Sequence, residues 1–389
     1  MVGGLQLPDT VQIHDVTLRD GEQQAGVEFT TDDKLRIAEA LSEAGIHRIE
    51  AGLPAVSPAD QAAVKKIAAA GFESEIYAFS RCMINDVQMA IDAGVSGVIM
   101  EVPASHHMIE KAYNWPVERA IEASISSTKF AHENGLKVTF FPIDATRASM
   151  AELLDDLEMI ATEGHVDAVG LVDTFGVCSP HAISYYTRRV RERMGVPLET
   201  HFHMDFGMGV ANSLLAVGEG ASVIQTTVSG IGERAGNAPT EETVLALLTM
   251  YGMDIGIRTE HFTPIARLVA ELSGVAQTPN RPITGETLFN IESGIITTWV
   301  KNVGNELTEA VPFLPELVGQ PPVELVLGKG SGIDSVAIWL GRHGVNDAET
   351  SDMEAILTEV KAKSLEKKGL LDDEDFLAIA REILPGRIG

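Results

Sequence analysis

The chain has 389 residues, 45% of them hydrophobic, which is enough for a large core and too many residues for one small domain. Its net charge of −27 argues against nucleic acid as a partner, because a phosphate backbone requires a basic face. Two cysteines, Cys82 and Cys178, make no disulfide framework, and residues 1–10 show no signal-peptide pattern. No uncharged apolar run approaches the ~18 residues of a membrane span. We therefore expect a cytoplasmic protein with neither a nucleic-acid nor a membrane partner.

Short β-branched segments alternate with longer amphipathic segments along most of the chain. The expected strands are VQIHDV (11–16), IHRIEA (46–51), SEIYAF (74–79), GVIMEV (97–102), KVTFFP (137–142), AVGLVD (168–173), LETHFH (198–203) and SVIQTTV (222–228). Helical segments between them end at Gly45, Gly71, Gly94, Gly135, Gly164 and Gly220, and glycine commonly stops a helix. Eight strand–helix pairs within about 250 residues predict a (β/α)₈ TIM barrel, with an open doubly wound sheet as the alternative.

The pattern changes in the last third of the chain. Residues 276–330 are rich in proline and glycine with little helical periodicity, whereas residues 345–386 are charged and have a helical pattern. We interpret residues 1–275 as a catalytic barrel. Residues 276–389 are then expected to form a linker or lid and a small, mostly helical accessory subdomain.

Potential metal ligands follow two of the expected strands. Asp20 comes just after the first strand, and His201 and His203 end the seventh. Residues two apart on a strand point to the same side, so both imidazoles can face the barrel interior. Chemistry in TIM barrels takes place at the carboxyl ends of the strands, where these three side chains would meet. Two imidazoles and one carboxylate suit Mn²⁺, Zn²⁺, Co²⁺ or Mg²⁺.

Arg19 precedes the candidate ligand Asp20. Making or breaking a carbon–carbon bond next to a carbonyl passes through an enolate or alkoxide. A guanidinium beside a bound metal can stabilise that negative charge, so Arg19 and Asp20 are our catalytic candidates. The alternative is an Arg–Asp ion pair that closes the bottom of the barrel.

Several motifs together resemble the TIM-barrel metallolyases that carry an aspartate–arginine–metal site. The matching segments are DVTLRDGEQQAGVEFT (15–30), HRIEAGLPAVSPAD (47–60), DATR (144–147), DTFGVCSP (173–180), HFHMDFGMGVANSLLAV (201–217), GIGERAGNAPTEE (230–242) and LGKGSGIDSV (327–336). This family includes isopropylmalate, homocitrate and citramalate synthases and hydroxymethylglutaryl-CoA lyase. The resemblance implies a TIM barrel, a divalent metal ion and a homodimer whose C-terminal region reaches the partner's active site.

The resemblance also implies roles for individual residues. It places a metal on Asp20, His201 and His203, with Asn237 close to it, and makes Arg19 the stabiliser of the enolate. Substrate-binding positions are Arg19, Gln23, Arg147 and Thr174, where a guanidinium and a hydroxyl suit the carboxylate of a 2-oxo acid. The simpler alternatives are a helix cap for Thr174 and a surface salt bridge for Arg147.

Three pocket positions depart from the synthases. Ile143 stands where the synthases have an acid, Met204 replaces an Asn or Asp, and Ile296 replaces a histidine. Ile143 and Ile296 cannot transfer protons, so the acid–base group must differ from the family's usual one. An apolar wall formed by Ile143, Met204 and Ile296 would favour a substrate with an apolar group.

The residues leave three functions open. The first is a metal-dependent acyltransferase that condenses an acyl-CoA with a 2-oxo acid and has an altered pocket. The second is a retro-aldol or retro-Claisen lyase or a decarboxylase, with His106, His107, Glu50 or Glu292 as acid or base. The third is a metabolite-binding protein without turnover. Acyl-CoA remains a possible co-substrate, since no CoA site is visible, and GKGSG (328–332) is too short for a nucleotide P-loop.

Overall fold

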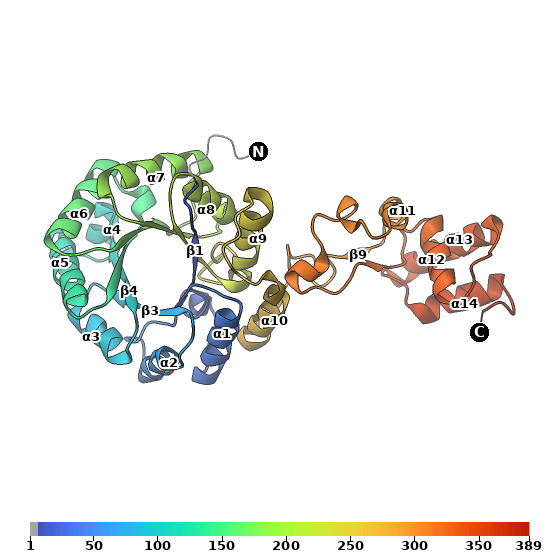
Figure 1. Cartoon of the computed structure of the whole chain (residues 1–389), viewed down its shortest axis with the longest axis horizontal. Helices are drawn as coiled ribbons and strands as arrows, with labels where there is room; N and C mark the ends of the chain where they lie inside the picture. The colour runs from blue at the N-terminus through green and yellow to red at the C-terminus, as the bar shows by residue number, and fades with distance from the viewer. Residues whose placement is uncertain (1–6, 389) are drawn as a thin grey trace. The chain divides into compact units, whose positions relative to one another are not determined.

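The structure is a computed structural model and describes residues 7–388. Eight parallel strands close into one barrel in the order β1 to β8, with helices around the outside (Figure 1). The strands are β1 (Gln12–Asp15), β2 (Arg48–Glu50), β3 (Glu75–Arg81), β4 (Gly97–Pro103), β5 (Lys137–Ile143), β6 (Ala168–Asp173), β7 (Leu198–Phe202) and β8 (Val223–Thr226). The predicted TIM barrel is confirmed, and the open sheet is excluded because β8 pairs with β1.

Amphipathic helices cover the barrel. They are α1 (Thr31–Glu43), α2 (Pro58–Ala68), α3 (Ile84–Ala93), α4 (His106–Lys111), α5 (Val117–Glu133), α6 (Met150–Glu163), α7 (Pro180–Met194), α8 (Gly209–Gly218), α9 (Thr240–Tyr251) and α10 (Phe262–Ser273). Most of the glycines expected to stop helices adopt a positive φ, as Gly94 does at 79°. Gly164 does not: it follows the end of α6, where a Cβ would overlap Thr128 and lie 2.7 Å from the Ile160 carbonyl oxygen, so the position requires glycine for lack of space.

The barrel interior contains a network of buried polar side chains. Glu199 on β7 is fully buried and accepts hydrogen bonds from Arg48 of β2 (2.6 Å), Thr139 of β5 (3.0 Å) and Gln225 of β8 (3.2 Å). These strands are not all neighbours, so the bonds cross the interior and show which face of each strand points inward. These donors satisfy the lone pairs of the buried carboxylate, which lowers the cost of burying it.

An apolar layer lies at the mouth of the barrel. Its buried members are Tyr77, Phe79, Ile99, Phe141 and Val172, with partly buried Leu53 and Ile143 packed against them. They come from β3, β4, β5 and β6 and the loop after β2. Burying this much aromatic and aliphatic surface stabilises the fold and also gives the mouth an apolar floor.

The chain divides into two compact units after Gln277. The second unit holds a two-stranded sheet of β9 (Asn290–Ile291) and β10 (Glu324–Leu325), with α11 (Gly294–Val303), α12 (Ile333–Arg342), α13 (Thr350–Lys367) and α14 (Asp373–Ile383). Its core includes Trp339, Ile356 and Phe376. The mostly helical C-terminal region is confirmed. The expectation of little helix within 276–330 is wrong at α11, whose helical period is short and lies between glycine- and proline-rich segments.

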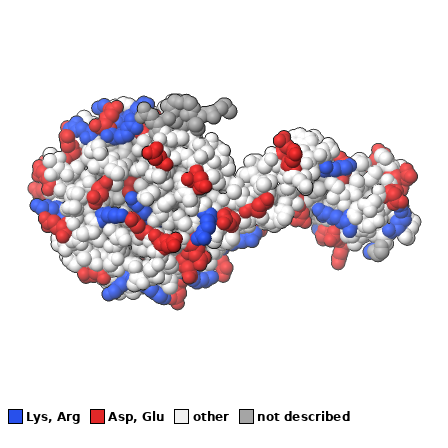
Figure 2. All heavy atoms as spheres, in the orientation of Figure 1, with Lys and Arg blue, Asp and Glu red and all other residues white. Residues whose placement is uncertain are grey.

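None of the described helices is long and apolar enough to cross a membrane. Figure 2 shows acidic and basic side chains interspersed over the visible face of the barrel. On this face the acidic side chains are therefore intermixed with basic ones and do not form one continuous acidic patch.

Candidate metal centre and active site

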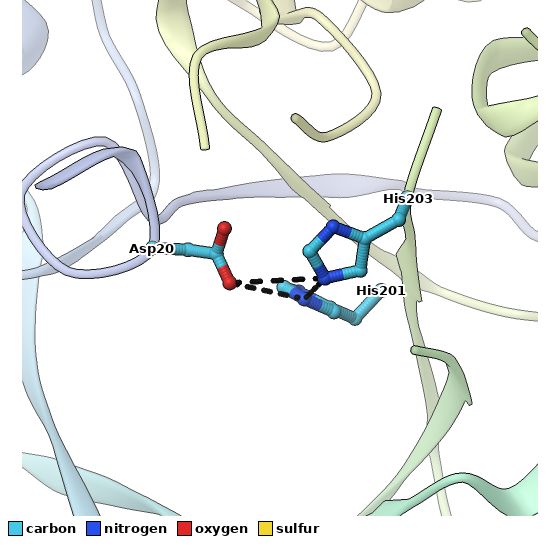
Figure 3. Close-up of side chains that lie close together, drawn as sticks. All are labelled: Asp20, His201 and His203. Atoms are coloured by element: carbon cyan, nitrogen blue, oxygen red, sulfur yellow. Dashed lines mark hydrogen bonds and ion pairs between the residues drawn. The ribbon is translucent and has the colours of Figure 1, made fainter. Parts of the chain in front are cut away.

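Three side chains converge at the mouth of the barrel, from opposite parts of the sequence (Figure 3). Asp20 lies in the loop after β1, just before the 3₁₀ turn Gly21–Gln23, whereas His201 lies on β7 and His203 directly follows it. Asp20 Oδ2 is 3.6 Å from His201 Nε2 and 3.9 Å from His203 Nε2, and the two Nε2 atoms are 3.3 Å apart. All three residues are buried.

Hydrogen bonds behind the two rings fix their tautomers. His203 Nδ1 lies 3.1 Å from the Gly236 carbonyl oxygen, which can only accept, so Nδ1 carries the proton. His201 Nδ1 lies 3.0 Å from Gln225 Oε1, also an acceptor, because Gln225 Nε2 donates to Glu199. With one proton on each ring, both Nε2 atoms therefore present lone pairs to each other and to a carboxylate. Such a trio is repulsive alone and suits a cation between its members.

The protonation states agree with a metal site. Burial lowers the pKa of His203 to about 4, despite the opposing attraction of Asp20. Burial also opposes ionisation of Asp20, but the Arg19 guanidinium and the two imidazoles outweigh it and hold the carboxyl pKa well below its usual range. His203 is thus neutral and Asp20 ionised at neutral pH, the forms that bind metal.

Asn237 completes this side of the site. Its Nδ2 donates to Asp20 Oδ1 at 2.5 Å, while its buried Oδ1 has no hydrogen-bond partner among the described residues. An unpaired buried carbonyl oxygen next to three potential ligands is itself a potential ligand. The loop approaches closely here: a Cβ at Gly232 would overlap Asn237 and lie 2.7 Å from Asp20 Oδ1, so only glycine fits.

Arg19 lies beside the cluster and is buried. Its Nη1 donates to Asp20 Oδ2 (2.9 Å) and Gln23 Oε1 (3.2 Å), and its Nε donates to Glu50. The guanidinium carbon lies 4.2 Å from the centre of the Phe79 ring. Its Nη2 is buried and has no partner among residues 7–388. The Arg19–Asp20 ion pair exists, but it is at the carboxyl end of the strands and not at the bottom of the barrel.

Glu50, expected as a possible acid or base, holds Arg19 instead. One carboxylate oxygen accepts the Arg19 Nε proton, and the other lies 3.3 Å from His14 Nε2, with both residues fully buried. Burial opposes ionisation of Glu50, but the Arg19 and His14 contacts keep its pKa below the usual range. An ionised carboxylate in this position orients the guanidinium.

Arg147 and Thr174 lie close together on the loops after β5 and β6. Thr174 Oγ1 accepts the Asp144 backbone N–H at 2.8 Å, so Thr174 does not cap a helix; Ser179 caps α7. Arg147 forms a two-point ion pair with Asp144 at 2.5 and 3.0 Å and stacks on the Phe175 ring at 4.1 Å. The salt-bridge alternative is thus present at Arg147, although its exposed guanidinium remains near Thr174.

A second arginine, Arg234, also lies on the Phe175 ring, and the sequence did not predict this contact. Arg234 lies 5.5 Å from the centre of the Phe175 ring, donates to the Thr174 carbonyl oxygen at 2.5 Å and pairs with Asp205 at 2.9 Å. The GERAGN motif contained this residue, but only the fold places it beside Thr174. Two arginines therefore lie on Phe175, each partly neutralised by an aspartate.

The three residues that differ from those of the synthases lie on different elements. Ile143 packs against the apolar layer at the mouth. Met204 turns its sulfur toward the start of α8, where a Cβ at Gly209 would lie 2.7 Å from it. Ile296 is on α11 in the second unit. Within the barrel unit, the structure places Ile143 against the apolar layer and Met204 against the start of α8.

The other acid–base candidates are engaged elsewhere or lie outside this unit. His106 lies 2.9 Å from Asp156 of α6, and Glu292, in the second unit, accepts the Gly330 backbone N–H at 2.7 Å. His107 lies on α4.

A TIM barrel with a carboxylate, two proton-free imidazole nitrogens and an arginine at its mouth defines a class of metal-dependent enzymes acting on carbonyl compounds. The chain belongs to the HMGL-like family, whose model matches residues 10–269. The resemblance predicted from the motifs is confirmed.

Relatives cover nearly the whole chain. The homocitrate synthase AksA of Methanopyrus kandleri is 39% identical over 98% of this chain and 95% of its own length. The 2-isopropylmalate synthase of Methanocaldococcus jannaschii is 35% identical over 98% of this chain and 73% of its own. The hydroxymethylglutaryl-CoA lyase structure from Pseudomonas aeruginosa has a TM-score of 0.62 at 22% identity, covering 69% of this chain and 95% of that chain, which shows a shared fold.

Proposed function

We propose that the protein is a divalent-metal-dependent acyltransferase that condenses an acyl-CoA with a 2-oxo acid. The observation that carries this proposal is the convergence of Asp20 Oδ2 with two proton-free imidazole nitrogens beside Arg19. Synthase relatives aligned over almost the full chain favour condensation over the lyase and decarboxylase alternatives.

Asp20, His201 and His203 would hold the metal ion, and Asn237 Oδ1 could add a fourth ligand. When bound, Mn²⁺, Zn²⁺, Co²⁺ or Mg²⁺ would act as a Lewis acid toward the oxygens of a 2-oxo acid. Gln225 and the Gly236 carbonyl oxygen hold the imidazoles in the ligating tautomer.

Arg19 would stabilise the negative charge that develops as the carbon–carbon bond forms. Its unpaired Nη2 is the free donor, while Glu50, Asp20 and Gln23 fix the rest of the guanidinium. A donor fixed in advance in a site with little water costs no reorganisation during the reaction. Thr174 and Arg147 would bind the substrate carboxylate, as their hydroxyl and guanidinium chemistry allows.

We propose a 2-oxo acid with an apolar side chain as the acceptor. The floor under Arg19 and beside His201 is made of Phe79, Ile99, Phe141 and Ile143. A second, distal carboxylate in that environment would lack a partner, and burying an unpaired charge is costly.

The test is metal-dependent release of free CoA thiol when the protein is incubated with acetyl-CoA and a panel of 2-oxo acids, with product identified by mass spectrometry. We expect turnover with divalent metal and none with chelator. Asp20→Ala and His203→Ala should lose metal and turnover while the barrel stays folded by circular dichroism. Metal retained at wild-type stoichiometry in both variants would refute the assigned ligands.

We also propose a cytoplasmic homodimer, based on the family membership. Sedimentation of the whole protein should give twice the mass of 41.7 kDa. Removal of residues 278–389, the second compact unit, should then leave an inactive protein. A stable, active, monomeric barrel would contradict this assembly.

A further inference from the structure

Strand β4 carries a carboxylate toward the barrel mouth. Glu101 follows Ile99 by two residues on β4, so its side chain projects to the same interior side, one layer closer to the carboxyl end. In the sheet register Glu101 lies between Arg81 of β3 and Phe141 of β5. The Phe141 ring meets the His201 ring edge-on at 4.9 Å between centroids. One side chain thus separates Glu101 from a metal-binding imidazole.

Glu101 lies near Ile143 and, unlike Ile143, has a side chain that can transfer a proton. Ile143 pairs with Pro103, two residues beyond Glu101 on the adjacent strand. A group on β4 can therefore approach a substrate over the same apolar floor. Glu50, the other interior carboxylate near Arg19, is held by Arg19 and His14 and is not available.

No structural ion pair explains Glu101. Arg81 is bound to Asp86 through two contacts at 2.6 and 3.1 Å, and Arg19 is bound to Asp20 and Glu50. Among residues 7–388, Glu101 has no cation within ion-pair distance, and the hydroxyl of Tyr113 lies 3.5 Å from its Oε1. A partly buried carboxylate facing an active site without a cation partner is free to accept a proton.

The electrostatic surroundings suit that task. Burial raises the pKa of Glu101, and Asp86 adds to the increase, while Arg19, Arg81 and the Tyr113 hydroxyl oppose it. A carboxylate whose pKa is raised is a stronger base.

We infer that Glu101 is the catalytic base of the condensation, an inference that rests on the proposed function. Its carboxylate takes a proton from the carbon next to the thioester carbonyl, and the C–H electron pair becomes the enolate. The enolate carbon attacks the keto carbon of the 2-oxo acid, whose C=O π electrons become the alkoxide. The protonated Glu101 returns its proton to that alkoxide, so charge and protons balance, and Arg19 stabilises both anions.

The test compares wild type with Glu101→Gln, which keeps size and removes the base. We expect kcat to fall about 10²- to 10⁴-fold, the usual contribution of a positioned acid–base group. Thermal-shift titrations with Mn²⁺ and the 2-oxo acid should give unchanged affinities, since Glu101 contacts no metal ligand. Glu101→Asp should recover part of the rate. Glu110→Gln, an exposed carboxylate on α4, is the matched control and should leave kcat unchanged.

The pH profile gives a second readout. Wild-type kcat should fall on the acid side as Glu101 becomes protonated, and Glu101→Gln should lose that limb. An active wild type together with a Glu101→Gln variant that keeps its kcat, or changes only KM, would overturn the base assignment alone. An inactive wild type with every acyl-CoA and 2-oxo acid would overturn the proposed function and this inference together.

Discussion

His201 and His203 face each other with their Nε2 atoms 3.3 Å apart, and hydrogen bonds behind each ring place the ring proton on Nδ1. The protein therefore fixes two lone pairs against each other before any ion binds. His203 relies on a backbone carbonyl, but His201 relies on a side chain, Gln225, which is itself held by Glu199. Replacing Gln225 can therefore change the tautomer of His201, whereas the backbone carbonyl behind His203 cannot be removed by substituting a side chain.

Gln225→Leu should lower metal affinity about 10- to 100-fold, the usual effect of removing a hydrogen bond that orients a ligand. In the variant, His201 is free to rotate or to move its proton from Nδ1 to Nε2. A protonated Nε2 has no lone pair with which to bind a cation. Competition with a fluorescent chelator measures the change. Thr200→Val is the control, because Thr200 lies between Glu199 and His201 on β7 and has no side-chain partner among the described residues. Equal affinities in both variants would contradict the proposed role of Gln225.

His203 should make the stability of the metal-free protein depend on pH. Its pKa is lowered from 6.5 to about 4 in the folded state, so between these values the unfolded chain binds more protons. The free energy of unfolding should then fall as pH decreases through this window, by at most roughly 3 kcal/mol from this residue.

His203→Gln should flatten the denaturant-midpoint profile between pH 6.5 and about 4. His47, whose pKa burial also lowers, contributes in the same direction and remains in both proteins. Urea midpoints measured with chelator present isolate the His203 contribution. A variant profile as steep as that of wild type would show that His203 is not held neutral.

Arg19→Lys should leave metal bound and lower kcat about 10²- to 10³-fold. Lysine keeps the charge but cannot contact Asp20, Gln23 and Glu50 while presenting a further donor, as the guanidinium does. Metal content and steady-state kinetics on the same preparation separate the two effects. Arg36→Lys, on α1, provides a matched control. Loss of metal from Arg19→Lys would mean that Arg19 acts chiefly by holding Asp20.

Much of the fold and part of the site follow from local sequence. The eight strands and the glycine-terminated helices were predictable because period-two and helical patterns are local properties. The meeting of Asp20 with His201 and His203 followed from one rule, that all strand ends of a parallel barrel share one rim.

Contacts set by strand register were not predictable. The position of Gln225 behind His201 depends on how β8 aligns with β7, and the contact of Glu50 with Arg19 depends on how β2 lies beside the end of β1. Arg234 beside Phe175 depends on the course of a loop. The contact of the Met204 sulfur with the start of α8 at Gly209 was not predictable either, because a side-chain rotamer after a strand end depends on the space available.

The last prediction concerns the acceptor substrate. If the floor of Phe79, Ile99, Phe141 and Ile143 receives the side chain of the 2-oxo acid, kcat/KM should rise from pyruvate to branched or longer aliphatic 2-oxo acids. Each buried methylene contributes about 0.8 kcal/mol, or roughly a fourfold increase in kcat/KM. 2-Oxoglutarate should be a poor substrate, because its distal carboxylate would be buried without a partner.

Ile143→Glu should erase the aliphatic preference, and Ile91→Glu, a change of the same size on α3, is the folding control. Efficient homocitrate formation by the natural protein would refute this pocket, since it would require a distal carboxylate to bind against the apolar side chains of this floor.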